Sequence, residues 1–134
     1  MLGKSNLRQK LNRKQQRDLD IEISFMEGVV RKDPRFVEAW TVLSDDYLRR
    51  GKPSEGLEVN KQLSRIRSGD PSILYNLACS YSLTKNLKQS AFALSKAVAN
   101  GFSDFKWMMK DPDLRNLRND PLFKKIWRKI SILR

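Results

Sequence analysis

Few residues in this sequence have the types and spacing that catalysis or metal binding requires. Histidine is absent and Cys79 is the single cysteine, so the usual general base at neutral pH and the commonest metal ligand are missing. The sequence offers no Lys-His-Asp setting that would activate Cys79, so a small packing residue is the expected role of this thiol. The acidic pair Asp45–Asp46 lacks the ligand spacing of a calcium loop. We therefore expect a protein that is not an enzyme, with no catalytic residue, no cofactor and no metal site.

Positive charge is the other chemical feature of the chain. Lys and Arg number 27 against 15 Asp and Glu, a net charge of +12. The excess is concentrated at both ends, because neither residues 1–17 nor residues 121–134 contain an acid. Such fields attract nucleic acid, acidic protein surfaces or anionic lipid. The predicted basic patch comprises Lys4, Arg8, Lys10, Arg13, Lys14, Arg17, Lys124, Lys125, Arg128 and Lys129.

The compartment follows from the same residues. A lone cysteine fits a reducing environment, no apolar run approaches the roughly 18 residues of a membrane span, and the first twenty residues lack the apolar centre of a secretory signal. We expect a cytoplasmic protein with no membrane span. Residues 1–17 are basic, with Leu7 and Leu11 one helical turn apart, so a targeting segment for organelle import stays as the alternative to a basic N-terminal helix or arm.

Apolar residues recur every three or four positions, which predicts helices. The predicted helices cover residues 18–32, 35–50, 53–68, 71–84, 87–100 and 121–133, with short helical turns over 104–110 and 112–118. Gly51 and Gly101 are predicted to end helices. An acid followed by a first-turn proline predicts a helix start, and the sequence contains this pair four times, at Asp33–Pro34, Asp70–Pro71, Asp111–Pro112 and Asp120–Pro121. No alternating strand pattern is present, so the fold class is all-α.

The helices form repeats. Shifting the sequence so that Trp40 falls on Leu74 also aligns Leu43 with Leu77 and Tyr47 with Tyr81. This alignment, which we call the repeat register, extends over residues 18–100. The pattern Trp-x-x-Leu-Ser-x-x-Tyr from Trp40, followed by its counterpart from Leu74, resembles the first helix of the tetratricopeptide repeat (TPR) family, whose unit is about 34 residues long. Ser44 and Ala78 stand where the family has glycine, and an asparagine, Asn60, stands where an aromatic residue is usual.

That resemblance implies a short, right-handed TPR-like helical solenoid of about two and a half helix-turn-helix repeats. The expected organisation is a basic arm over 1–17 and repeats over 18–100, divided into a half unit (18–34) and two units (35–69 and 70–100). The pattern of Asp-Pro-Asp-Leu, Leu-Arg and Asp-Pro over residues 101–134 is similar to a segment that follows the last repeat in many bacterial TPR proteins. These C-terminal capping helices would cover the open end of the solenoid.

The resemblance also implies a concave groove lined by the first helix of each unit. The positions carried over to this sequence are Glu38, Thr41, Asp45, Leu48 and Arg49 in one unit, and Ser72, Tyr75, Asn76, Cys79 and Ser82 in the next. Some family members clamp a partner's terminal carboxylate there with Lys and Asn. Thr41 and Asp45 are wrong for that role, so tight binding of acidic C-terminal peptides is not expected.

The expected function is therefore that of a noncatalytic protein–protein interaction module or scaffold, which binds a peptide or partner helix in the groove. The alternative is a basic adaptor that binds RNA, the ribosome or another polyanionic surface through its cationic termini. A third reading places the final helix on a membrane surface. A homodimer is also open, because so few repeats leave a face that a second copy would complete.

Overall fold

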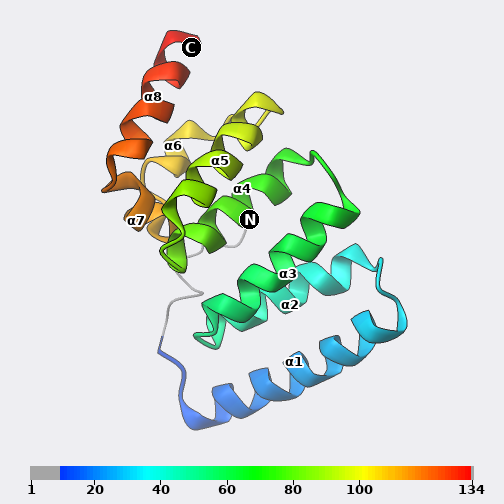
Figure 1. The fold of residues 1–134 in the computed structure, drawn as a ribbon. Coiled ribbons are helices and arrows are strands. Elements are labelled where there is room, and N and C mark those ends of the chain that lie inside the picture. The colour runs from blue at the N-terminus through cyan, green and yellow to red at the C-terminus, as the bar shows by residue number, and fades with distance from the viewer. Residues whose placement is uncertain (1–9, 134) are drawn as a thin grey trace. The chain divides into compact units, whose positions relative to one another are not determined.

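The structure, a computed structural model, describes residues 10–133, and every regular element in that range is a helix (Figure 1). The all-α fold class is therefore confirmed. The chain divides into two compact units, the first ending at Ile66 and the second beginning at Arg67.

The first unit contains α1 (Arg13–Lys32), α2 (Val37–Arg49) and α3 (Pro53–Ile66). The helix α2 lies between the other two and contacts both (Figure 1). Apolar residues spaced at three and four positions meet between these helices and bury one another. The buried positions include Leu19, Ile23, Val30, Leu43, Leu57 and Leu63.

The first helix begins earlier than the apolar pattern predicts. Residue 18 was the expected start, but α1 begins at Arg13 because Asn12 and Gln15 form a capping box. The Asn12 side chain accepts from the Gln15 N–H at 2.8 Å, and Gln15 Oε1 accepts from the Asn12 N–H at 2.9 Å. Reciprocal capping of this kind starts a helix without any apolar residue. The expected boundary between residues 17 and 18 therefore lies inside a continuous helix.

The second unit contains a long helix pair followed by short elements and a final helix. These are α4 (Pro71–Leu83), α5 (Leu87–Ala99), α6 (Phe105–Met108), the 3-10 turn η2 (Pro112–Leu114), α7 (Arg115–Arg118) and α8 (Pro121–Leu133). The predicted short turns and final helix are thus confirmed. The innermost side chains of this unit come from both the helix pair and the short elements: Ala78, Leu94, Ala97, Met108, Leu114 and Leu117.

The hairpins α2–α3 and α4–α5 have the same internal geometry. Both α2 and α4 are 13 residues long, and they begin at Val37 and Pro71, which are equivalent positions in the repeat register. Their partners α3 and α5 begin at Pro53 and Leu87, which are equivalent positions as well. The repeat register of the sequence is therefore also a register of the helix boundaries.

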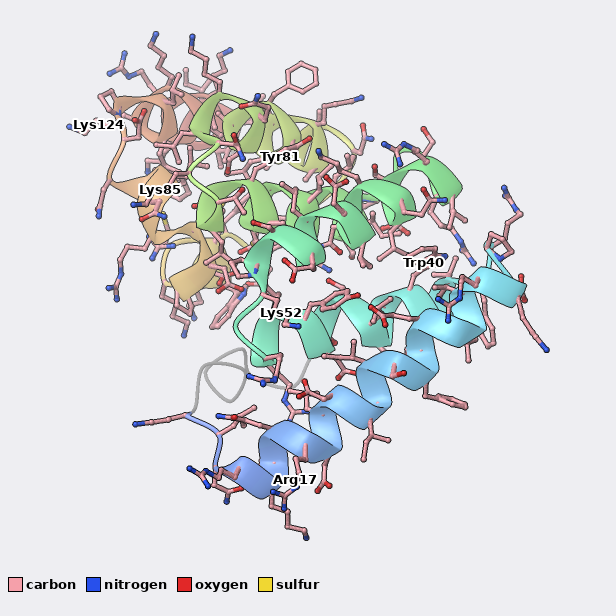
Figure 2. The ribbon with its side chains drawn as sticks, turned by 60° about the horizontal axis from the view of Figure 1, so that its bottom comes forward. Arg17, Trp40, Lys52, Tyr81, Lys85 and Lys124 are labelled. Atoms are coloured by element: carbon pink, nitrogen blue, oxygen red, sulfur yellow. The ribbon has the colours of Figure 1, made fainter. Side chains whose placement is uncertain are left out.

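The turns of the two hairpins match in detail. After α2, the Lys52 N–H donates to Tyr47 O and the Gly51 N–H to Leu48 O. After α4, the Asn86 N–H donates to Tyr81 O, the equivalent pair of the next repeat, and the same pattern follows. This is a Schellman motif, whose key residue needs a positive φ. Gly51 has φ of 79°. Lys85, which is labelled in Figure 2, lies at the matching position and has φ of 63°.

Three of the four Asp-Pro pairs begin helices as predicted. Asp70 accepts from the Ser72 and Ile73 N–H groups, and the Asp111 and Asp120 carboxylates accept likewise from Asp113 and Leu122. The prediction for Asp33–Pro34 is wrong. Asp33 ends α1, since its N–H donates to Val29 O, and α2 begins only after Phe36.

Candidate functional site

The predicted groove positions on α2 lie at the surface. Glu38, Thr41, Asp45 and Arg49 are exposed on this helix. Leu48 is half-buried and lies at the crossing with α3, where a Cβ on Gly56 would be 3.5 Å from its Cδ2 atom. We define the α2 face as Glu38, Thr41, Asp45 and Arg49. It presents two acidic side chains, one basic side chain and one hydroxyl to solvent.

The corresponding positions on α4 are placed differently. Tyr75, Cys79 and Ser82 are buried, Asn76 is half-buried, and Ser72 is exposed near the start of the helix. What buries them is the chain's own segment 101–118, which we call the covering segment; its elements η2 and α7 contact α4. In this structure the Tyr75, Cys79 and Ser82 side chains face the covering segment and not solvent, whereas Ser72 is exposed.

The link between α4 and the covering segment centres on Asp111, which is fully buried. Its Oδ2 atom accepts from the Tyr75 hydroxyl at 2.7 Å and from Cys79 Sγ at 3.6 Å. Burial raises the pKa of Tyr75 above its usual range, with Cys79 and the hydrogen bond to Asp111 adding to the effect. The Tyr75 hydroxyl therefore stays protonated and acts as a permanent donor to the carboxylate.

Further contacts complete this attachment. The Tyr75 ring stacks on Phe102 with 4.0 Å between ring centroids and 6° between planes. Ser82 Oγ accepts from the Leu117 N–H at 3.2 Å, and its carbonyl accepts from the Asn116 amide at 2.9 Å. Buried polar groups that are paired in this way hold a segment in one register.

Arg118 holds the covering segment together from within. Its Nη1 atom donates to Met108 O at 3.0 Å and to Asp111 O at 2.6 Å. This one nitrogen can satisfy two carbonyls at once because it carries two N–H donors. The segment is thus a built part of the second unit.

The basic patch is solvent-exposed where the structure describes it. Lys10, Arg13, Lys14 and Arg17 lie on or just before α1, and Lys124, Lys125, Arg128 and Lys129 lie on α8. Figure 2 shows Arg17 and Lys124 directed outward from their helices. Lys4 and Arg8 lie outside the described residues. The two groups belong to different units.

A carboxyl pair between α1 and α2 was missed by the sequence reasoning. Asp46 is only 3% exposed and lies beside Glu22. Burial, followed by the hydrogen bond and charge of Glu22, raises the pKa of Asp46 to about 7. Two neighbouring contacts, Tyr47 with Glu27 and Arg50 with Asp20 at 2.7 Å, add polar links between the same part of the chain and α1. The regular apolar spacing on α2 gives no sign that this acid is buried, because the helix that covers it lies elsewhere in the sequence.

The sequence reasoning also missed an apolar hollow beside α8, whose lining includes Phe92 of α5. Phe92 on α5 is 68% exposed, although it is a large aromatic residue. In the repeat register it aligns with Glu58, which is exposed on α3. A phenylalanine at a solvent position of the repeat is the signal that could have identified this surface.

The described residues contain neither a metal cluster nor a membrane-spanning helix. Within residues 10–133, no three His, Cys, Asp or Glu side chains come together closely enough to hold a metal ion. None of the helices in that range is both long and apolar enough to cross a bilayer.

Comparison with known proteins gives a match that covers part of the chain. No family model matches the sequence. The chain is similar to a protein of Arabidopsis thaliana that is named as chloroplastic, with 35% identity over 85 residues. The match takes in 58% of this chain and 25% of that protein, so the chain spans about a quarter of the length of this curated relative.

Proposed function

We propose that this protein is a noncatalytic protein–protein interaction module built from TPR-like repeats. The observation that carries the proposal is the repeated hairpin: the helices of α2–α3 and α4–α5 begin at equivalent positions of the repeat register. They also share the turn geometry at Gly51 and Lys85. Repeats of about 34 residues stack into right-handed solenoids that display an extended binding surface.

The proposed organisation follows from these hairpins. Residues 35–69 and 70–100 are the two repeats, α1 is the second helix of a half repeat that its capping box extends into the basic arm, and residues 101–134 close the last repeat. At the helix crossings, Gly56 lies near Ser44 O, and its counterpart Ser90 donates to Ala78 O at 2.7 Å. Small residues at matched crossings support one packing scheme for both hairpins.

We place the partner on the α2 face. Its counterpart on α4 already has an occupant, since the covering segment fills it through Asp111 and Leu117. The α2 face is exposed and carries the two acids and one arginine that would orient a peptide or partner helix. Because helical packing fixes the backbone of α2 beforehand, little ordering free energy is lost when a partner binds.

A photo-crosslinking experiment tests this assignment. The full-length chain would carry a benzoylphenylalanine in place of Thr41, or in place of Glu58 on α3 as the matched control. The expected result is a protein adduct at position 41 that is lost when Glu38 and Asp45 are both changed to Arg. Adducts that are identical at both positions, or that contain nucleic acid and no protein, would contradict the proposal.

A polyanion-binding role is the second candidate, and one cavity favours it. Arg118, Lys124 and Arg128 line a hollow of about 530 Å³ together with Phe123 and Trp127. The rings of Phe123 and Trp127 stack with 6.4 Å between centroids. Cations beside aromatic rings suit a single-stranded nucleic acid, which combines phosphates with bases that stack.

The salt dependence of binding separates this candidate from the first. Affinity for single-stranded RNA would fall with a log–log slope of about −0.7 per phosphate contacted. The double variant Lys124→Glu/Arg128→Glu should contact fewer phosphates and so reduce the total slope, whereas Glu38→Arg/Asp45→Arg should not reduce it. RNA affinity that is unchanged by the α8 variant would remove this candidate.

A further inference from the structure

A second hollow lies on the other side of α8, between α8 and α5. These two helices contact each other within the second unit (Figure 1). The hollow, which we call the α5–α8 groove, has a volume of about 570 Å³. Its apolar lining comes from both helices: Ala91, Phe92 and Val98 from α5, and Ile126, Ile130 and Leu133 from α8. This volume lies within the range of ligand pockets, roughly 300–1,000 Å³.

The groove has a buried floor and exposed apolar sides. Ile126 and Ile130 are buried and belong to the core of the unit. Phe92 and Leu133, in contrast, are 68% and 81% exposed. Ala91, a small residue, also lines the groove. Contiguous apolar surface of this kind typically marks an interaction site.

Cations surround this apolar surface. Lys125 and Lys129 of α8 line the groove itself, and Lys96 of α5 lies over the Phe92 ring, with 5.7 Å between Nζ and the ring centroid. The helices α5 and α8 together carry six Lys and Arg and no acid. An occupant must therefore bring apolar side chains for the floor and carboxylates for the rim.

We propose that the α5–α8 groove binds an acidic amphipathic helix of a partner protein. Each of its two walls is a helix of 13 residues, which is about 20 Å long at 1.5 Å per residue and matches four turns of a docked helix. An apolar stripe at three- and four-residue spacing would contact Phe92, Val98 and Leu133, and flanking Glu or Asp would pair with Lys125 and Lys129. This is the helix-in-groove mode of recognition.

A protein helix fits the geometry better than a lipid surface does. A bilayer binds protruding apolar side chains that penetrate it, and it gains little from a hollow. Here the buried apolar floor lies between two helices, with Phe92 and Leu133 exposed at its sides and Lys125 and Lys129 in its lining. The site shares no residue with the α2 face, so this inference stands or falls independently of the function proposed above.

The test uses the full-length protein and a synthetic probe. The probe is a fluorescent peptide of about 18 residues with Leu at alternating three- and four-residue spacing and Glu on the flanks, which gives an amphipathic helix. A scrambled peptide of equal composition and charge is its control. Fluorescence anisotropy should show that the amphipathic peptide binds. The affinity of the scrambled peptide should be lower by about tenfold or more, because specificity needs a continuous apolar stripe.

Two charge reversals on α8 localise the binding. Lys125→Glu/Lys129→Glu changes the groove side of the helix, whereas Lys124→Glu/Arg128→Glu makes the same change in net charge on its other side. The first should weaken binding about tenfold or more and the second less than about twofold, since only the first places like charges beside the peptide. Phe92→Ala should also weaken binding about tenfold, as the loss of an aromatic anchor does.

Several results would overturn the proposal. One is an equal loss in both double variants, because it would mean that net charge alone attracts the peptide. A second is that the scrambled peptide binds as tightly as the amphipathic one. A third is that the protein binds phosphatidylglycerol vesicles more tightly than the peptide, and that the groove variants weaken both kinds of binding equally. Circular dichroism and the reactivity of the buried Cys79 thiol verify that each variant is folded, so that a loss of binding reports on the groove.

Discussion

Asp46 is a carboxyl that folding moves out of water and places beside another carboxyl, that of Glu22. Its pKa rises from an ordinary 3.8 to about 7, chiefly because of burial, while Arg49 opposes the rise and Asp45 adds to it. The folded state therefore holds more protons than the unfolded state between about pH 4 and pH 7. The contribution of Asp46 to stability therefore falls as pH rises through that window, and it is least favourable above about pH 7.

Asp46→Asn is expected to remove this effect. The amide is neutral at every pH and can donate to Glu22, so the variant should gain about 2 kcal/mol of unfolding free energy at pH 8 and little at pH 4. Urea unfolding at the two pH values measures the difference. Asp45→Asn, an exposed change on the same helix, is the control and should shift stability only slightly. A gain of equal size at both pH values would show that the buried charge is not its cause.

Lys85 is the residue that takes a glycine's conformation. Its φ of 63° matches that of Gly51 at the same position of the preceding turn, and a side chain in the left-handed region costs roughly 1–2 kcal/mol. Lys85→Gly should stabilise the protein by about 1 kcal/mol once the added freedom of the unfolded chain is included. The reciprocal Gly51→Lys should destabilise it by a similar amount, although no atom lies within 4 Å of a Cβ there. Thermal unfolding of both variants measures the two changes in stability. Changes of the same sign would contradict the expectation that the backbone at both positions favours glycine.

At the scale of elements, most helix boundaries could be predicted because their signals are local. A first-turn proline and an acid before it act within three residues, as Asp70 does at α4. Asp33–Pro34 is the same pair of residues but lies at the end of a helix. The Asp33 carbonyl accepts from the Phe36 N–H, which forms a turn before α2 begins. The start of α1 escaped prediction for a related reason, since a capping box between polar residues leaves no trace in the apolar pattern.

The candidate site could be predicted only in part. The family resemblance implied that Tyr75, Cys79 and Ser82 lie together on the first helix of their unit, but it did not indicate what covers them. Tyr75 and Asp111 are 36 residues apart in the sequence, and no periodicity relates a tyrosine to an aspartate at that distance. Long-range pairing depends on how the chain folds back, which is a property of packing and not of local pattern.

The attachment of the covering segment to α4 should depend on Asp111. Asp111→Ala leaves the Tyr75 hydroxyl without this acceptor and removes the cap of η2, at a cost of about 2–4 kcal/mol. Since Cys79 is the single cysteine and is buried beneath the segment, its reaction with a disulfide reagent should accelerate by about tenfold or more.

Asp104→Ala is the matched control for this experiment. Asp104 caps α6 through the Trp107 N–H at 3.1 Å and is exposed, so its removal should cost only about 1 kcal/mol and leave the thiol protected. Equal acceleration in both variants would mean that the whole segment opens regardless of the Asp111 contact.

At the scale of the molecule, each of the two units has its own buried core. In the second unit, Leu94 of α5 and Met108, Leu114 and Leu117 of the covering segment are all fully buried. The hairpin α4–α5 and the covering segment therefore complete each other. A fragment of residues 67–134 should fold alone, because many domains of about 60 residues do so when their core is closed.

That fragment should unfold cooperatively on heating, with a helical circular dichroism spectrum and a Cys79 thiol that reacts about tenfold slower than in urea. A shorter fragment, residues 67–109, keeps the hairpin but loses Asp111, Leu114 and Leu117. It should show a broad transition and a rapidly reacting thiol, because one helix pair cannot bury its apolar face by itself. Equal protection of Cys79 in the two fragments would mean that α4 and α5 suffice for the core. The covering segment would then be an added ligand of the α4 face, not a part of the fold.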